Sequence, residues 1–319
     1  MEPENCPADD VRDEIICADS ADALKTIDDE SLGLVVTSPP YNIGKEYELD
    51  KRLSLEEYLE WLRPIVKQLC AKVKKNGSIC WQVGNYVNKG QVVPLDYLFY
   101  QIFIDAGFKM RNRIIWRFNF GLHATNRLSG RYETLLWFTK SDDYTFNLDP
   151  IRVPQLYPGK RHSKSKGERA GEPSGNPLGK NPSDYWEFSA EEAFLSDPVW
   201  ELPNVKANHP EKTPHPCQFP SELVERCILA LTNPGDTVLD PFVGAGTTVI
   251  ASKKHHRHSI GIDQSPEYAK LATERLNDFL EGNLKLRRAG QATRRPKPGE
   301  KVSTVPDTWL KTAEHAGDK

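Results

Sequence analysis

The segment DPFVGAGTT at residues 240–248 constrains the fold more than any other part of the chain. A short apolar run, Thr237 to Leu239, precedes it, and a helix-like run, Thr247 to Lys254, follows it. A strand, a glycine turn and a helix in this order are typical of nucleotide sites in doubly wound α/β folds, where glycines let the backbone approach the ligand. The segment lacks the full GxGxxG pattern and has no phosphate-loop lysine, which weakens a nicotinamide or ATP interpretation.

The next apolar run, Ser259 to Ile262, ends at Asp263. An acidic residue about 20 positions further on, at the end of the second strand, is the acceptor that this geometry requires for ribose hydroxyls. The alternative is a plain turn followed by a helix-capping aspartate. The spacing favours a nucleoside cofactor over that alternative.

Strand-like and helix-like runs alternate along most of the chain, which predicts an α/β fold with a mostly parallel sheet. The other expected strands are 32–36, 78–83, 108–118 and 132–139, and the other expected helices are 55–74, 94–106, 220–231 and 266–280. Ser54 and Glu57 form a capping box before the helix 55–74, and Gly77 is expected just past its end.

The run 32–36 leads into a second motif, Thr37-Ser38-Pro39-Pro40-Tyr41-Asn42. The prolines fix the backbone and leave carbonyl acceptors, Ser38 adds a hydroxyl acceptor, and Tyr41 adds a flat ring. Two acceptors on the N–H bonds of an exocyclic amine steer its lone pair at a methyl donor, while the ring stacks on a base flipped out of a duplex. The alternative is a diproline turn, but a place at the carboxyl end of a strand favours a ligand site.

Composition excludes several classes of protein. Apolar residues make up 38% of the chain and charged residues 27%, and no run approaches the roughly 20 apolar residues of a membrane helix. The acidic N-terminus has no apolar signal region, which predicts a cytoplasmic protein. Six scattered cysteines without a CxxC pair indicate reduced thiols, and we expect neither a disulfide framework nor a metal site.

Together the two motifs resemble those of site-specific DNA methyltransferases that modify cytosine N4 or adenine N6 with S-adenosylmethionine. Residues 16–24, Arg131 to Lys140 and the stretch HPCQFP at 215–220 are also similar to this family. The resemblance implies that the catalytic residues are Ser38, Pro39, Pro40 and Tyr41. It implies that S-adenosylmethionine is bound by Asp19, Thr37, His215, Gln218, Asp240, Pro241, Phe242, Gly244, Gly246, Thr247, Thr248 and Asp263.

The order of the motifs, with the catalytic motif first, resembles the beta class of the family. It implies a Rossmann-like S-adenosylmethionine-dependent methyltransferase fold, a mostly parallel twisted sheet with helices on both faces, plus an irregular target-recognition insertion. The expected organisation is a catalytic half at 14–140, a target-recognition region at 141–206, a cofactor-binding half at 207–284, and a basic polar tail at 285–319 that we expect to be disordered.

Basic residues gather in the expected target-recognition region, although the net charge of the chain is −3. Residues 154–182 interleave them with glycine and proline. A solvated loop is one interpretation, and contact with DNA phosphates is the better one for a DNA substrate. The residues predicted to bind DNA are Lys160, Arg161, Lys164, Lys166, Arg127 and Arg131.

Ser38 narrows the expected substrate. The adenine enzymes usually carry Asp or Asn at this position and the cytosine-N4 enzymes more often Ser, so we favour the N4 amine of a flipped-out cytosine in double-stranded DNA. Adenine N6, an RNA or glutamine-amide substrate, and a non-catalytic DNA-binding relative are the alternatives; the intact glycine motif argues against the last. The resemblance also implies a restriction-modification system with a cognate restriction endonuclease as a candidate partner, and it leaves monomer and homodimer open.

Overall fold

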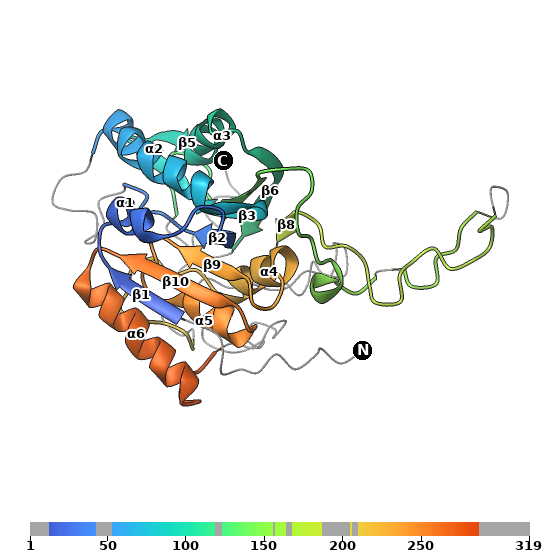
Figure 1. Ribbon diagram of the computed structural model, residues 1–319. Coiled ribbons are helices and arrows are strands. Elements are labelled where there is room, and N and C mark those ends of the chain that lie inside the picture. Colours follow the sequence, from blue (N-terminus) through green and yellow to red (C-terminus); the bar gives the residue numbers. More distant parts are fainter. Residues whose placement is uncertain are drawn as a thin grey trace, which may run out of the picture.

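The computed structural model describes residues 13–42, 53–118, 123–155, 157–163, 168–186, 205 and 210–286. An eight-stranded sheet runs through the centre of this part in the order β1-β10-β9-β2-β3-β7-β6-β8 (Figure 1). Its strands are β1 (Asp13–Cys17), β2 (Leu32–Thr37), β3 (Val73–Val83), β6 (Lys109–Arg117), β7 (Tyr132–Thr139), β8 (Tyr185–Trp186), β9 (Thr237–Asp240) and β10 (His258–Asp263). β4 (Asn85–Asn88) and β5 (Gln91–Pro94) form a separate hairpin.

The sheet is mostly parallel, as the alternating pattern predicts. β1, β10, β9, β2 and β3 pair in parallel with their neighbours. β7 is antiparallel to both β3 and β6. The amino end of β7 therefore lies at the same edge of the sheet as the carboxyl ends of β2, β3 and β9.

Helices cover both faces of the sheet (Figure 1). On one face lie α1 (Ser20–Ala23), α2 (Leu55–Lys72) and α3 (Leu95–Asp105), and on the other lie α4 (Ser221–Leu231), α5 (Thr247–Lys254) and α6 (Pro266–Leu280). β2 is buried along its whole length because Val35 packs towards α2 and α3, whereas Leu34 and Val36 pack towards α4. Alternating side chains of a strand point to opposite faces, so a strand between two helical layers is apolar throughout.

The end of α2 differs from the sequence expectation. The capping box of Ser54 and Glu57 is present, but α2 ends at Lys72 and β3 begins directly at Val73. Gly77 lies inside β3, and a Cβ atom there would lie 2.9 Å from the carbonyl oxygens of both Leu32 and Gly33. The glycine is required by close packing of β3 on β2, where the register of the two strands shifts, and not by the end of a helix.

The central neighbours β2 and β9 mark a switch in topology. From β9 the chain crosses through α5 to β10 on one side, and from β2 it crosses through α2 to β3 on the other. Ligand crevices of open α/β sheets form outside the carboxyl ends of strands at such a point. The two motifs follow these two strand ends. No helix in the described ranges is long and apolar enough to cross a membrane.

The described residues between 152 and 180, which we call the arm, project from the body after the short helix η3 (Asp149–Ile151) (Figure 1). Isolated bridges join Val153 to Lys180 and Arg161 to Pro173 across its two sides. Gly179 has φ +109°, and a Cβ atom there would lie 2.4 Å from the Val153 carbonyl oxygen, so the base of the arm requires glycine. The chain returns to the sheet at β8, beside β6. The expected tail lies outside the described residues from 287 onwards.

Candidate active site

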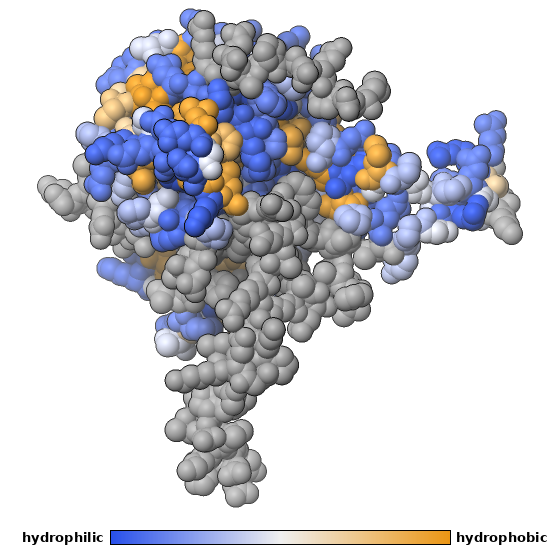
Figure 2. All heavy atoms as spheres, turned by 90° about the horizontal axis from the view of Figure 1, so that it is seen from below, coloured by the Kyte–Doolittle hydropathy of each residue, from blue (hydrophilic) through white to orange (hydrophobic). Residues whose placement is uncertain are grey.

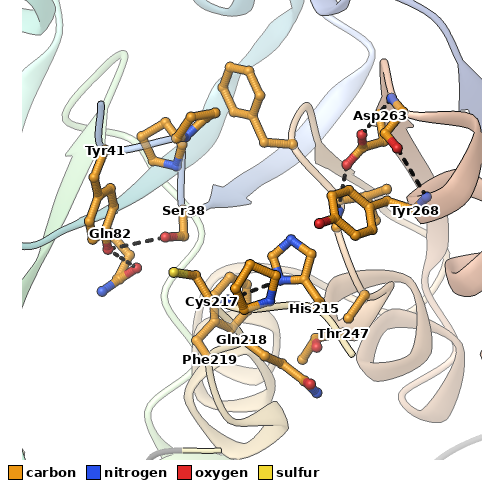
Figure 3. Close-up of a pocket in the computed structure, with 18 of the residues that line it drawn as sticks. Ser38, Tyr41, Gln82, His215, Cys217, Gln218, Phe219, Thr247, Asp263 and Tyr268 are labelled. Atoms are coloured by element: carbon orange, nitrogen blue, oxygen red, sulfur yellow. Dashed lines mark hydrogen bonds between the residues drawn. The ribbon is translucent and has the colours of Figure 1, made fainter. Parts of the chain in front are cut away.

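A pocket of about 670 Å³ opens at the carboxyl ends of β2 and β9 (Figure 3). This volume is ordinary for a site that binds an organic ligand. The predicted site residues that line it are Asp19, Ser38, Pro39, Pro40, Tyr41, His215, Gln218, Phe242, Gly244, Thr247 and Asp263. The fold therefore brings the two distant motifs and the HPCQFP stretch into one cavity.

The glycine turn is held from behind by α6. Gly246 has φ +76°, caps α5, and would place a Cβ atom 3.0 Å from Ala272. Arg275 donates a hydrogen bond to the Ala245 carbonyl. Gly244 has φ +49°, and a Cβ atom there would lie 2.9 Å from His215 Nε2. Both glycines are thus required by backbone conformation and by close neighbours.

Asp263 connects the end of β10 to the glycine turn. Its Oδ2 accepts a hydrogen bond from the Gly244 amide at 3.0 Å, and its Oδ1 accepts one from the Ser265 amide at 2.9 Å. Burial raises the pKa of Asp263, and the two amide donors oppose that shift. A carboxylate has about four acceptor positions, so these two bonds leave acceptor capacity at the pocket wall. Asp19 lies on the same wall and caps α1 through the Ala21 amide at 2.8 Å.

Asp240 joins the two motifs beneath the pocket. Its Oδ1 accepts a hydrogen bond from Thr37 Oγ1 and its Oδ2 one from Thr248 Oγ1, both at 2.6 Å. Burial raises the pKa of Asp240 to about 6. Beside this junction, the Pro241 carbonyl accepts a hydrogen bond from Ser20 Oγ at 2.6 Å. Thr37, Asp240, Pro241, Gly246 and Thr248 lie behind the residues that line the cavity, and their contact with a cofactor stays a prediction.

The Thr37–Asn42 motif, which we call the catalytic turn after its predicted role, forms the opposite wall of the pocket (Figure 3). Ser38 Oγ donates to the Tyr41 hydroxyl at 3.1 Å, and that hydroxyl donates to Gln82 Oε1 at 2.7 Å. Tyr58, on α2, donates its hydroxyl to the Pro40 carbonyl at 2.5 Å. The turn is therefore fixed by side chains from a helix and from a neighbouring strand as well as by its own prolines.

The HPCQFP stretch faces both walls (Figure 3). His215 packs its ring edge-on to Tyr268, with centroids 4.6 Å apart, and burial lowers its pKa to about 4. The Gln218 amide accepts from Thr213 Oγ1 at 3.0 Å and donates to the Glu211 carbonyl at 2.9 Å. His215 is thus a neutral imidazole at physiological pH, and Gln218 holds the shape of this segment.

Sequence reasoning missed several residues that line the pocket. Among them are Trp61, Gln82, Trp116, Glu133, Cys217, Glu267 and Tyr268. A signal existed for three of them, since Cys217 belongs to the HPCQFP stretch that resembles the family. Gln82 is a polar residue in an otherwise apolar strand, and Glu133 lies in the stretch from Arg131 that resembles the family. In the described part of the chain, no group of three or more His, Cys, Asp and Glu side chains is arranged to hold a metal ion.

The residues predicted to bind DNA fall into two places. Arg127 and Arg131 lie in the connection between β6 and β7, at the pocket edge of the sheet. Lys160 and Arg161 lie exposed on the arm and do not line the pocket. Lys164 and Lys166 lie outside the described residues.

Comparison with known proteins identifies the family. A family model described as DNA methylase, whose label covers N6 and N4 methyltransferases, matches residues 32–274. The chain belongs to this DNA methylase family. The match begins in β2 and ends in α6, so it spans both motifs, the HPCQFP stretch and the arm, whereas Asp19 of the pocket wall precedes it.

Individual relatives agree with the family. The DNA methylase is 47% identical over 260 residues to the type II methyltransferase M.BglII of Bacillus subtilis, covering 81% of this chain and 67% of the relative. It is 32% identical over 270 residues to the DNA adenine methyltransferase YhdJ of Escherichia coli (strain K12), covering 82% of each.

Solved structures confirm the predicted fold. The PvuII DNA methyltransferase, described as cytosine-N4-specific, superposes with a TM-score of 0.61 at 21% identity, covering 86% of this chain and 93% of that one. TTHA0409 of Thermus thermophilus, in complex with S-adenosyl-L-methionine, superposes with a TM-score of 0.56 at 25% identity, covering 85% of this chain and 97% of that one. The DNA methylase therefore has the Rossmann-like S-adenosylmethionine-dependent methyltransferase fold.

Proposed function

We propose that this DNA methylase transfers a methyl group from S-adenosyl-L-methionine to the exocyclic N4 amine of a cytosine flipped out of double-stranded DNA. The observation that carries the proposal is the position of Ser38. Its hydroxyl stands beside Pro39 and Tyr41 on one wall of a pocket whose other wall is the glycine turn. A neutral hydroxyl at this position is more typical of the cytosine-N4 enzymes of the family.

The pocket residues fit S-adenosylmethionine. The Asp263 carboxylate keeps acceptor capacity suited to ribose hydroxyls, and the rings of Phe242 and Trp61, 5.9 Å apart, supply apolar surface for a purine. Gly244 and His215 also line the cavity. When bound, the cofactor supplies a methyl group on a positively charged sulfur. A neutral His215 adds no second positive charge to that region.

Ser38 and Pro39 orient the target amine. The serine oxygen and the proline carbonyl accept its two N–H bonds, which turns the nitrogen lone pair out of conjugation and towards the glycine-turn side of the pocket. Tyr41 stacks on the flipped base. Transfer is direct, so the proposal assigns no nucleophilic role to Cys217, although it lines the pocket.

The relatives also support a place in a restriction-modification system. Type II methyltransferases such as M.BglII and M.ScaI are among them, at 47% and 35% identity. A cognate restriction endonuclease is therefore a candidate partner, and the cytoplasm, where the chromosome lies, is the proposed location. Arg127, Arg131, Lys160 and Arg161 are proposed to contact DNA phosphates. Adenine N6 is the second candidate substrate, because YhdJ, an adenine methyltransferase, is 32% identical.

The test is to methylate DNA with the purified protein, digest it to nucleosides and identify the product by mass spectrometry. N4-methylcytosine is expected. N6-methyladenine would overturn the choice of base, and methylation of RNA or a glutamine amide in place of DNA would overturn the substrate.

A double variant tests the assigned residues. Ser38→Ala with Tyr41→Ala should lower the transfer rate by about 100-fold or more, because aligned acceptors act on the transition state. Binding of S-adenosylmethionine should persist. The matched control is Ser31→Ala with Tyr97→Ala, two positions outside the pocket lining. Full methyl transfer by the Ser38/Tyr41 variant would contradict the assigned roles.

A further inference from the structure

A line of hydrogen bonds runs from the catalytic turn across two strands to a carboxylate. Ser38 donates to Tyr41, Tyr41 donates to Gln82 Oε1, and Gln82 Nε2 donates to the Glu133 carboxylate. We call these four residues the Ser38–Glu133 chain. Gln82 is 2% exposed, and both Gln82 and Glu133 line the pocket.

The sheet fixes the spacing of this chain. β3 and β7 are antiparallel neighbours, with Gln82 opposite Leu135 and Val83 opposite Thr134. Gly84 directly follows the end of β3, and a Cβ atom there would lie 3.1 Å from the Tyr41 ring and 3.3 Å from Glu133 Oε1. The absence of a side chain at Gly84 leaves room for the ring and the carboxylate at the same strand end.

The direction of every bond in the chain follows from its last member. Gln82 turns its NH₂ group towards Glu133, whose carboxylate oxygen accepts the hydrogen bond. The amide oxygen of Gln82 then faces Tyr41, and Tyr41 must donate to it. The tyrosine oxygen is left to accept, and the single hydroxyl hydrogen of Ser38 points at it. The lone pairs of Ser38 Oγ are thereby left for a substrate.

This direction matters for an amine substrate. If Tyr41 donated to Ser38 instead, the serine hydrogen could point into the pocket and would meet an N–H bond of the amine. We propose that Glu133 and Gln82 are positioning residues, which hold Ser38 as a hydrogen-bond acceptor towards the target amine. The inference rests on the proposed role of Ser38, and it adds a reason for the buried glutamine and the carboxylate that the two motifs do not contain.

The test is a double-variant cycle on the rate of methyl transfer at saturating DNA and S-adenosylmethionine. Glu133→Gln should lower the rate on the order of 10-fold, because a neutral amide accepts or donates equally well and no longer fixes the direction. The dissociation constant for S-adenosylmethionine should change by less than about twofold, since the chain acts on the target amine. Glu274→Gln, the same substitution on exposed α6 outside the pocket lining, should match the unmodified protein.

The decisive comparison is made with Tyr41→Phe, which removes the hydroxyl that links Gln82 to Ser38. Glu133→Gln should have almost no further effect in the Tyr41→Phe protein, because the connection is already broken. Glu133→Asp, which keeps an acceptor-only end, should recover part of the rate. If the fold-losses in rate of the two single variants multiply in the double variant, Glu133 acts independently of Tyr41, through its charge or through folding. The proposal would then be wrong.

A second substitution covers the case in which Glu133→Gln does not fold. Gln82→Met keeps the length of the side chain and removes both polar groups, and its effect should also vanish in the Tyr41→Phe protein. The rates in the double-variant cycle are measured on whichever methylated base the protein forms. A product other than N4-methylcytosine therefore overturns the proposed base while leaving the chain testable, and additive losses overturn the chain alone.

Discussion

Two regions of the molecule are stabilised by different kinds of contact: the Asp240 junction beneath the pocket, and the exposed arm. At the junction Thr37, Asp240 and Thr248 are each 1% exposed or less and are joined by side-chain hydrogen bonds. On the arm, isolated backbone bridges and exposed bonds from side chains to carbonyls, such as that from Arg161 to Gly171, join the sides, and Tyr157 is 75% exposed. The surface of the arm is mostly hydrophilic (Figure 2).

The contrast separates two requirements of a DNA methylase. Methyl transfer needs atoms held within fractions of an ångström, which buried polar bonds on strand ends provide. Contact with the DNA backbone needs reach and positive charge, which an exposed loop supplies. Substitutions at the junction should therefore change stability, whereas substitutions on the arm should change DNA binding.

The largest effect is expected at the junction. Asp240→Ala removes the acceptor of two buried threonine hydroxyls and of the Phe242 amide, and it should lower the free energy of unfolding by about 3 kcal/mol. Urea denaturation measures this loss. Asp142→Ala is the control, because the 71% exposed Asp142 side chain pairs with Lys109 and Arg111 at the surface and should cost less than about 1 kcal/mol. Equal losses would mean that the junction is not the anchor described above.

A smaller effect, visible only with DNA, is expected on the arm. Lys160→Ala with Arg161→Ala should weaken DNA binding and reduce the slope of log affinity against log salt by about 1.8, the value for two lost phosphate contacts. Stability should change by less than about 0.5 kcal/mol. Fluorescence anisotropy over a salt series measures the slope.

The control for the arm is Lys25→Ala with Lys270→Ala, which removes two exposed charges from the body of the protein. An unchanged slope in the arm variant, or the same change in the control, would remove the arm from the DNA interface.

An effect confined to acid pH concerns the segment that faces both walls of the pocket. Burial lowers the pKa of His215 from 6.5 to about 4, so the unfolded chain binds a proton at higher pH than the folded one. The stability that neutral His215 preserves is complete above pH 6.5 and is lost as the pH falls towards 4. His215→Gln should remove this loss, as measured by thermal unfolding between about pH 7 and pH 4.

Asp240 changes the stability with pH in the opposite direction, over an overlapping pH range. Burial raises its pKa from 3.8 to about 6, so the part of its contribution to stability that is linked to proton binding is complete below pH 3.8 and is lost as the pH rises through 6. The His215 prediction is therefore read as the difference between variant and unmodified protein at each pH. A difference that does not change with pH would contradict it.

Local sequence signals predicted the helices and strands that are marked by capping residues or by hydrophobic periodicity. The ranges of β7, α5 and α6 match the sequence expectation, since Pro266 opens α6 and β7 is rich in β-branched and aromatic residues. Gly77 misled the prediction, because a glycine after a helical run resembles a helix end, whereas here it is required by the neighbouring strand. That contact lies outside any local window.

Site residues that belong to compact motifs could be predicted from the sequence. Site residues that strand register brings into the pocket could not. Ser38, Tyr41, Gly244 and Asp263 belong to compact motifs, and all four line one pocket. Glu133 reaches the catalytic turn only because β7 runs antiparallel to β3 with one particular register. Nothing in the spacing between Ser38 and Glu133 along the chain indicates that they meet.

The pairing of β1 with β10 and of β2 with β9 has a consequence for synthesis. The first two strands to leave the ribosome are separated in the finished sheet by the last two, and Thr37 meets Asp240 across 203 positions of sequence. β2 therefore waits with one edge unpaired until almost the whole domain has emerged, which exposes it to association with other chains. A chain that ends before β9 lacks two of the eight strands and the glycine-turn wall of the pocket, so we expect methylation only after these strands have been synthesised.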